Sequence, residues 1–157
     1  MKKIQVKKGE MLQSKGDLNT SVYRVESGLL RSYSIDDNGK EHIYMFASEN
    51  WIIADSTAPG EAAQLFIDVL EDSVVEISEK HIREITKDET EKLIKRLEVL
   101  QNRIIMLMSA PAIERYEHFV KTYPDIIQRV PQKMIASYLG ITPEALSTVK
   151  RAYYRSK

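Results

Sequence analysis

The stretch QKMIASYLGITPEALSTVKRA, residues 132–152, constrains the fold more than any other part of the chain. It predicts two short helices that cross closely at Ala136, where a larger side chain would not fit. Between them stands Gly140, at the point where the turn needs a left-handed backbone that glycine adopts most easily. Thr142 can cap the second helix, and Pro143 stands in its first turn, where a missing N–H has no cost. This spacing predicts a helix-turn-helix.

Apolar residues occupy the positions of this stretch that pack one helix on the other: Ile135, Leu139, Ile141, Leu146 and Val149. An ordinary helical hairpin has similar spacings, so the pattern alone leaves that interpretation open. Charge favours DNA binding, because residues 129–157 hold six Lys or Arg against one Glu, a net charge of +5. The other residues hold 17 positive and 22 negative charges. A basic segment on an acidic body is the electrostatic signature of a module that contacts phosphates.

The bulk properties of the chain exclude several classes of protein. Its 157 residues suffice for one good core or two small domains, and 43% hydrophobic content is typical of a soluble globular protein. There is no apolar run of membrane-spanning length and no apolar signal core, so we expect a cytoplasmic protein without a membrane partner. The absence of cysteine excludes disulfides, iron–sulfur clusters, thiolate zinc sites and cysteine nucleophiles.

The first 78 residues are typical of a β domain, which we place at residues 1–88. Short runs rich in Val, Ile, Tyr and Phe are predicted strands: KIQVKK, VYRVES, LLRSYSI, HIYMFA, LFIDVL and VVEIS. Turn signals separate them: KKGE at 7–10, SKGD at 14–17, ESG at 26–28, DDNGKE at 36–41 and APGE at 58–61. Strands this short and regular favour a sandwich, barrel or jelly roll over a βαβ sheet.

A long helix is predicted from about Glu79 to Met108. Its heptad seam consists of Leu93, Leu97, Leu100, Ile104 and Leu107. Further apolar residues (Ile94, Val99, Ile105, Met106 and Met108) give the helix a second apolar face, which favours burial between two chains over a helix that lies on its own sheet. We therefore expect a dimerisation helix at 89–108. The helix-turn-helix domain follows at 109–157, where Pro111 breaks the long helix and Ser109 can cap the next one.

This order of β-roll, long helix and C-terminal helix-turn-helix resembles the cyclic-AMP receptor protein and fumarate–nitrate regulator (Crp/Fnr) superfamily of bacterial transcription factors. VKKGEMLQSKGD resembles the opening strand and turn of the family, VYRVESGLLRSYSIDDNGKEHIYMFASENW its central roll, and VPQKMIASYLGITPEALS the helix-turn-helix of one branch. The resemblance implies an α+β fold with a cyclic-nucleotide-binding-like jelly roll. It also implies a homodimer joined through the long helix, a palindromic operator in double-stranded DNA, and RNA polymerase as a candidate partner.

The effector pocket departs from the pattern of that family. Its cyclic-nucleotide binders carry Gly-Glu to hold the ribose and Arg-Ser to hold the cyclic phosphate. The matching positions here fall near Ala54-Asp55 and Ala62-Ala63, so the pocket is degenerate. Because an anion buried without a paired cation is unstable, we expect no response to cyclic AMP or cyclic GMP. An unknown uncharged or cationic small-molecule effector and a purely structural roll both stay open; no cofactor is expected.

Candidate DNA contacts lie on the second helix of the helix-turn-helix and just before it. The resemblance places Pro143, Glu144 and Thr148 nearest the bases; Pro143 and Thr148 replace positions often held by Arg, which shifts readout towards A·T pairs. Glu144 can accept from a cytosine amino group, although an acidic residue also suits a helix N-terminus for purely structural reasons. Predicted phosphate contacts are Lys133, Thr142, Ser147, Lys150, Arg151 and Arg155.

The sequence therefore predicts a sequence-specific transcription regulator and not an enzyme. There is no nucleophile–base arrangement, and His42, His81 and His118 have no metal-ligand spacing. The alternative is a small-molecule sensing or protein-interaction module with weakened operator binding. It is motivated by the missing arginines and by the absence, after the recognition helix, of the β-hairpin wing that many members of the family carry.

Overall fold

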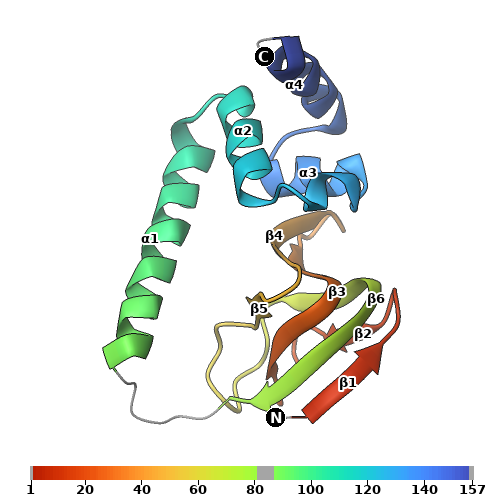
Figure 1. Ribbon diagram of the computed structural model, residues 1–157, viewed down its shortest axis with the longest axis vertical. Helices are drawn as coiled ribbons and strands as arrows, with labels where there is room; N and C mark the ends of the chain where they lie inside the picture. The colour runs from red at the N-terminus through yellow and green to blue at the C-terminus, as the bar shows by residue number, and fades with distance from the viewer. Residues whose placement is uncertain (1, 81–86, 156–157) are drawn as a thin grey trace. The chain divides into compact units, whose positions relative to one another are not determined.

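Figure 1 shows the computed structural model, which describes residues 2–80 and 87–155. Of residues 87–89, 92, 93, 95 and 96 the backbone alone is described. The chain divides into two compact units, Met1–Ile82 and Arg83–Lys157. The first is built from strands and the second from helices, so the predicted α+β class is confirmed. None of the described helices is long and apolar enough to cross a membrane.

The first unit is an antiparallel sheet that curls into a roll. Its strands are β1 (Lys2–Val6), β2 (Met11–Gln13), β3 (Ser21–Ile35), β4 (Glu41–Ala47), β5 (Ile52–Ile53) and β6 (Phe66–Glu79). They run in the order β1-β6-β3-β4, with β2 also paired to β6 and β5 to β3. The long strands β3 and β6 cross the whole roll and pair with each other along most of their length (Figure 1).

The prediction of six short strands is wrong at β3 and β6, each of which joins two predicted strands into one. The segment ESG, predicted as a turn, is a bulge within β3, where the pairing with β6 shifts register between Val25 and Leu30. Gly28 has φ +97°, and a Cβ there would lie 2.1 Å from Ser73 Oγ and 2.8 Å from the Asp72 carbonyl oxygen. A bulge bends a strand without ending its ladder, so a glycine between two apolar runs does not have to mean a turn.

The core of the roll is mainly aliphatic, with Tyr23 and Met45 among its buried members. Val25, Leu30, Ile67 and Val75 have no exposed surface, and the half-buried Trp51 packs against this cluster. The segment predicted as the DDNGKE turn does form the hairpin between β3 and β4. There the Asp36 carboxylate accepts from the amides of residues 38 and 40, each at 3.0 Å.

The second unit contains α1 (Lys87–Ser109), α2 (Ala112–Thr122), the short 3-10 helix η1 (Ile126–Gln128), α3 (Gln132–Leu139) and α4 (Pro143–Arg155). Because β6 continues to Glu79, the long helix cannot begin there as predicted. The prediction that Ser109 caps the next helix is also wrong: Ser109 ends α1, and its hydroxyl donates to the Ile105 carbonyl at 2.7 Å. Pro111 takes the cap position of α2, without a side-chain hydrogen bond.

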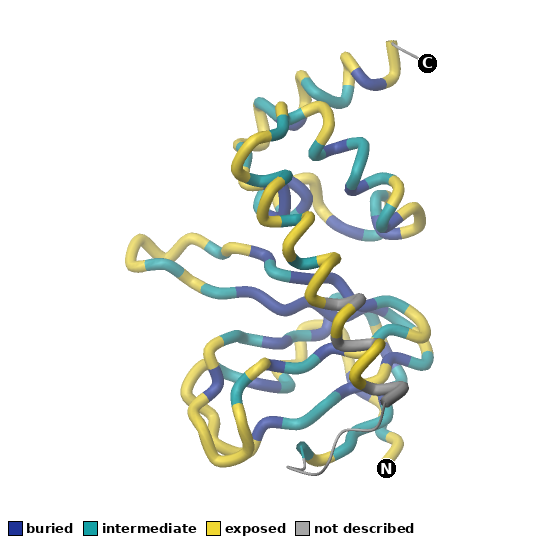
Figure 2. Tube along the Cα trace, turned by 90° about the vertical axis from the view of Figure 1, so that its left-hand side faces the viewer, coloured by how far each residue is buried: buried dark blue, intermediate teal, exposed yellow. Residues whose placement is uncertain are grey.

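Aromatic side chains fill the centre of the helical unit. The ring centres of Phe119, Tyr123 and Tyr138 lie 5.3–5.5 Å from one another. The rings of Tyr116 and Tyr153 meet edge to face, with their centres 5.3 Å apart. Figure 2 shows dark blue buried segments between teal and yellow ones in the helical unit. Of the two C-terminal tyrosines, Tyr153 is buried in this cluster whereas Tyr154 is 60% exposed.

Candidate nucleic-acid interface

The turn between α3 and α4 has the geometry that the sequence predicts. Gly140 ends α3 with a left-handed backbone, φ +66° and ψ +32°, and its N–H returns to the last turn of the helix. The amide of Ala145 donates to Thr142 Oγ1 at 3.2 Å, so Thr142 caps α4 as predicted. Pro143 is the first residue of α4. Helix, tight turn and capped second helix are thus fixed by residues 132–145.

The packing positions of this α3–α4 unit also agree with the prediction. Ile135, Ala136, Leu139 and Leu146 are each at most 1% exposed. Ile141 and Val149 are only half-buried. Ala136 has the small side chain that the close crossing requires, and it also supplies a carbonyl to the turn at 3.0 Å from the amide of Ile141.

One face of α4 is polar and exposed along its whole length. We call Glu144, Thr148, Arg151 and Arg155 the outer stripe; they follow one another at spacings of four, three and four, so they share a face opposite the buried Leu146. Bonds from its own backbone N–H and from the Thr142 hydroxyl lower the pKa of Glu144, so the carboxylate is ionised at neutral pH. Two of the predicted base readers and two predicted phosphate contacts therefore lie in one row.

Three other predicted contacts differ from simple surface groups. The Thr142 hydroxyl is used in the helix cap, and Ser147 Oγ donates to the Pro143 carbonyl at 3.1 Å. Lys150 is half-buried, and its Nζ donates to Gln132 Oε1 at 2.9 Å, so it links α4 to the start of α3. Lys133 and Pro143 are exposed.

The long helix α1 carries a wide exposed apolar face. Leu97 is 65% exposed and Ile104 57%, and both belong to the predicted heptad seam. Ile94, Ile105 and Met108 were predicted on a second apolar face, but they lie on the same side of α1 as Leu97 and widen this face, with Met108 81% exposed. Leu100 and Leu107, the remaining seam residues with described side chains, are half-buried; the side chain of Leu93 lies outside the described part. The seam is therefore split between an exposed face and the flank of the helix.

The loop between β5 and β6 is closed around the carboxylate of Asp55, which is 4% exposed. Asp55 Oδ2 accepts from the amides of Gln64 and Leu65, both at 2.8 Å, and Oδ1 from the amide of Thr57 at 2.9 Å. Burial alone would raise the pKa of Asp55, but these three amide bonds outweigh it and lower the pKa. Asp55, a predicted pocket residue, thus binds the amides of its own loop with its carboxylate. Ala54, the residue before it, is half-buried.

The side chains expected at the phosphate position supply no charge. Ala62 is exposed and Ala63 is 3% exposed, with its amide donating to the Asp17 carbonyl at 2.9 Å. Nearby on β6, Asp68 is held in a two-point ion pair by the buried Arg31, with N–O distances of 2.8 and 2.9 Å. Arg31 also binds Glu41, so its guanidinium is engaged on both sides.

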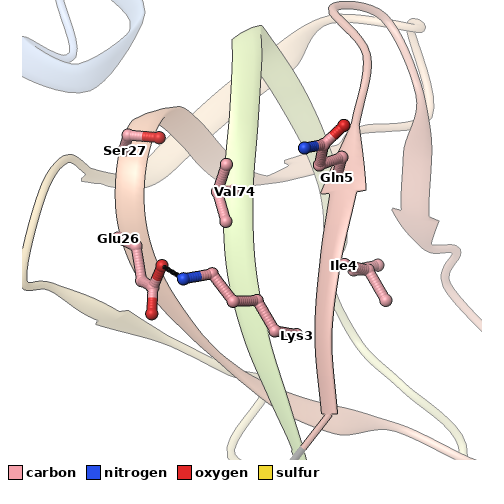
Figure 3. A pocket seen from close by; sticks show the side chains of 6 residues that line it. All are labelled: Lys3, Ile4, Gln5, Glu26, Ser27 and Val74. Carbon is pink, nitrogen blue, oxygen red and sulfur yellow. Dashed lines mark ion pairs between the residues drawn. The ribbon is translucent and has the colours of Figure 1, made fainter.

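Outside this loop, the described residues of the roll form a shallow hollow, and the described chain shows no candidate metal site. Figure 3 shows a hollow on the sheet surface lined by Lys3, Ile4, Gln5, Glu26, Ser27 and Val74, in which Lys3 and Glu26 form an ion pair. Within residues 2–80 and 87–155, no three His, Asp or Glu side chains are grouped to hold a metal ion. His42 contacts Asp36 Oδ2 at 2.7 Å, and the predicted His81 lies outside the described residues.

Sequence reasoning missed two residues that touch the α3–α4 turn, Arg103 of α1 and Arg115 of α2. Their guanidinium groups contact the carbonyls of Tyr138 and Leu139 at 3.4 and 3.2 Å. The one available signal was weak: Arg103 interrupts an apolar segment of the long helix on the side away from Leu97 and Ile104. Arginines on helices usually face solvent, so spacing alone does not identify such a contact.

Comparison with known proteins agrees with this architecture. Residues 3–96 match the family model described as cyclic nucleotide-binding domain. The electron transport regulator A of Shewanella oneidensis is 26% identical to the chain, over 99% of this chain and 70% of that protein.

Solved structures extend the similarity to the helical unit. FixK2 from Bradyrhizobium japonicum is similar with a TM-score of 0.80 at 19% identity, over 99% of this chain and 85% of that one. A CRP/FNR-family transcriptional regulator from Thermus thermophilus gives a TM-score of 0.73 at 17% identity, over 99% and 87%. At these identities the structures establish a shared fold, which includes the roll, the long helix and the helices that follow it.

Proposed function

The chain belongs to the cyclic nucleotide-binding domain family and is Crp/Fnr-like, and from this premise we propose that it regulates transcription by binding double-stranded DNA as a homodimer. The observation that carries the proposal is the outer stripe of α4. Glu144, Thr148 and two arginines stand exposed in one row on a helix whose opposite side is buried against α2 and α3. A helix held in this way presents its outer face to the major groove, as in helix-turn-helix proteins.

The stripe combines groups for reading bases with groups for binding phosphates. The ionised carboxylate of Glu144 accepts hydrogen bonds only, which suits the amino group of cytosine. Thr148 Oγ1 donates to the Glu144 carbonyl at 3.3 Å, which leaves its methyl group for contact with a thymine methyl. Arg151 and Arg155 continue the same row with positive charge, where phosphates flank the groove. Glu144 also stabilises the N-terminus of α4, so both interpretations of this residue apply together.

The exposed face of α1 supports the homodimer. Leu97, Ile104 and Met108 lie in water in a single chain, and an apolar face of this extent on a helix is typical of a buried interface. A second copy of α1 supplies a matching face with the same heptad spacing, as a two-fold interface requires. Dimerisation then places two α4 helices on one DNA duplex, about one helical turn or 34 Å apart.

The closed loop supports a regulator that does not respond to cyclic nucleotides. The amides of Gln64 and Leu65 are donors that an anion could use, but they already bind the carboxylate of Asp55. A cyclic phosphate would have to displace this internal anion, and Ala62-Ala63 provides no cation in exchange. The roll then has a purely structural role; the alternative of a small-molecule sensor requires this loop to open.

Selection of binding sites from random double-stranded DNA tests the proposal. The wild-type chain is expected to enrich a palindromic sequence with two half-sites, whereas a variant with Glu144→Gln and Thr148→Ala enriches a different sequence in the same arrangement. Lys121→Gln on the exposed side of α2 is the control for a lost charge and keeps the wild-type sequence. Enrichment of no sequence by the wild type, at a salt concentration where random DNA is not bound, would reject DNA-sequence recognition.

A further inference from the structure

We propose that Arg103 and Arg115 set the angle between α1 and the recognition helix α4, and with it the spacing between half-sites that the dimer accepts. The inference rests on the proposed function for its DNA consequence. The geometric part concerns a single chain, so it can be tested without DNA.

The C-terminus of α3 is where the two arginines meet. Backbone amides of the turn take up two of its last carbonyls, those of Ala136 and Ser137. The next two carbonyls accept from guanidinium groups: Tyr138 from Arg103 Nη2 at 3.4 Å and Leu139 from Arg115 Nη1 at 3.2 Å. A helix C-terminus carries partial negative charge, so two cations from two other helices suit this position.

Arg103 holds Tyr138 at two points. Its guanidinium carbon lies 3.9 Å from the centre of the Tyr138 ring, in addition to the 3.4 Å contact of Nη2 with the carbonyl of the same residue. Tyr138 is 4% exposed and packs against Phe119 and Tyr123. A flat guanidinium can stack on a ring and donate from its edge together, which a lysine ammonium cannot do. This contact therefore links α1 directly to the aromatic core.

Arg115 holds the junction between α1 and α2 on the same turn. Its Nε donates to the Ala110 carbonyl at 2.9 Å, next to the end of α1, while Nη1 reaches the Leu139 carbonyl. A Cβ on Gly140 would lie 3.8 Å from Arg115 Nη1 and 4.0 Å from Leu107 Cδ2, so both side chains lie beside the turn. The turn is thus held by α1 and by α2.

Small rotations at this turn have large effects on DNA geometry. The 13 residues of α4 extend about 20 Å, so a rotation of about 10° about the turn displaces the far end by about 3 Å. That displacement is roughly one base-pair step of B-DNA. The two half-sites of a dimer would shift by this amount in opposite directions, so loosening the contact broadens the range of spacings that bind.

Operators with varied spacers test the DNA consequence. Wild type is expected to prefer one spacer by at least about tenfold, whereas Arg103→Gln with Arg115→Gln binds spacers that differ by one base pair within about threefold. The preferred bases within each half-site stay unchanged, and Arg103→Lys with Arg115→Lys restores the preference only in part. Retention of the wild-type spacer preference by the Gln variant overturns the proposal, as does equal loss of binding to all DNA with loss of helix content.

A distance measurement tests the geometry alone. The chain has no cysteine, so Asn102→Cys on α1, away from the face of Leu97 and Ile104, and Ala152→Cys on α4 allow two spin labels at exposed positions. Labelled chains are mixed with excess unlabelled chain, so that each measured pair lies within one protomer. We expect one narrow distance in the wild-type background and a clearly broader distribution with the two Gln substitutions; Lys121→Gln leaves it narrow. An unchanged distribution rejects the positioning role, whereas a broadened one with no DNA selection rejects only the proposed function.

Discussion

The loop of the roll at residues 54–65 and the outer faces of the helical unit differ in whether their candidate binding groups are buried or exposed. In the loop, the carboxylate of Asp55 is buried and takes three backbone amides of its own chain. On α4, Glu144 and the two arginines of the outer stripe stand exposed, and on α1 Leu97 and Ile104 are more than half exposed. Both regions were candidates for binding, yet only one leaves its binding groups accessible.

This difference separates structural roles from functional ones. A buried polar group whose partners lie in its own chain stabilises the fold, and a ligand gains little from it. Exposed apolar and charged groups on rigid helices remain available to a partner. The roll therefore resembles ligand-binding domains in its fold, whereas the side chains that a partner could contact lie on the helical unit.

The largest effect is expected on the exposed face of α1. Leu97→Glu with Ile104→Glu places two charges on each side of the proposed interface, so the dimer should dissociate and operator affinity should fall at least about 100-fold. Leu100 is a poorer choice because it is half-buried within the chain. Sedimentation measures the oligomeric state and fluorescence anisotropy the affinity.

The matched control for that variant is Val99→Glu. Val99 is 52% exposed on α1 but lies nearly opposite Leu97 and Ile104, so the same substitution there should leave the dimer intact. Dissociation by both variants would mean that added charge destabilises α1 in general. A wild-type chain that sediments as a monomer at micromolar concentration contradicts the interface itself.

The second prediction concerns the closed loop. Asp55→Asn replaces one acceptor oxygen by a donor that faces the amides of residues 57, 64 or 65, so the free energy of unfolding should fall by about 2 kcal/mol or more. For a unit of this size the melting temperature should drop by roughly 10 °C. Asp37→Asn, at an exposed position of the β3–β4 hairpin, is the control with the same change and little expected effect. Calorimetry measures both.

The pH dependence of stability sharpens this prediction. The pKa of Asp55 is lowered in the folded chain from its ordinary value of 3.8, so its contribution is present above that pH and is lost as the pH falls through the folded pKa. The stability of the wild type should therefore fall between pH 5 and more acidic solution. The stability of Asp55→Asn should fall less over the same range. If the variant and wild type lose stability in parallel below pH 4, the carboxylate does not hold the loop.

The sequence was sufficient to predict the α3–α4 unit because its constraints are local. Gly140 needs a left-handed backbone, Thr142 caps the next helix, and Leu146 must face Leu139; each follows from residues a few positions apart. The helix α1 and its apolar face were predicted for the same reason, since a helix repeats its faces every few residues. These features depend little on the rest of the molecule.

The remaining features depend on contacts between distant residues, so local patterns could not predict them. Gly28 lies in a bulge because Ser73, on another strand, leaves no room for a side chain. Asp55 is not a ligand group because the amides of Gln64 and Leu65 fold back onto it. Arg103 contacts Tyr138, which is 35 residues away in the chain, and no spacing rule connects them.

A smaller effect is expected for base readout by the outer stripe. Glu144→Gln adds a donor where the wild type has two acceptors, so preference at one operator position should change by about fivefold to thirtyfold.

Lys133→Ala is the contrasting variant, since loss of a phosphate contact weakens all sequences alike. With about eight phosphates covered by the dimer, log affinity against log salt should slope near −7 and become shallower for Lys133→Ala. Equal losses on operator and random DNA for Glu144→Gln would remove Glu144 from base readout.

The smallest effect is the absence of one: cyclic AMP and cyclic GMP should give no saturable heat when titrated at millimolar concentration. A cyclic phosphate needs a paired cation inside the roll, usually an arginine with two donors. Arg31, the buried cation of β3, is already held by Asp68 and Glu41, and Ala62-Ala63 offers no charge. Displacing Asp55 from its amides would add a buried unpaired carboxylate, at a further cost of several kcal/mol. Binding with a dissociation constant below about 100 μM, roughly −5.5 kcal/mol, would show that Arg31 or another cation is released to the ligand. The roll would then be a sensor, and the contrast with the helical unit would fail.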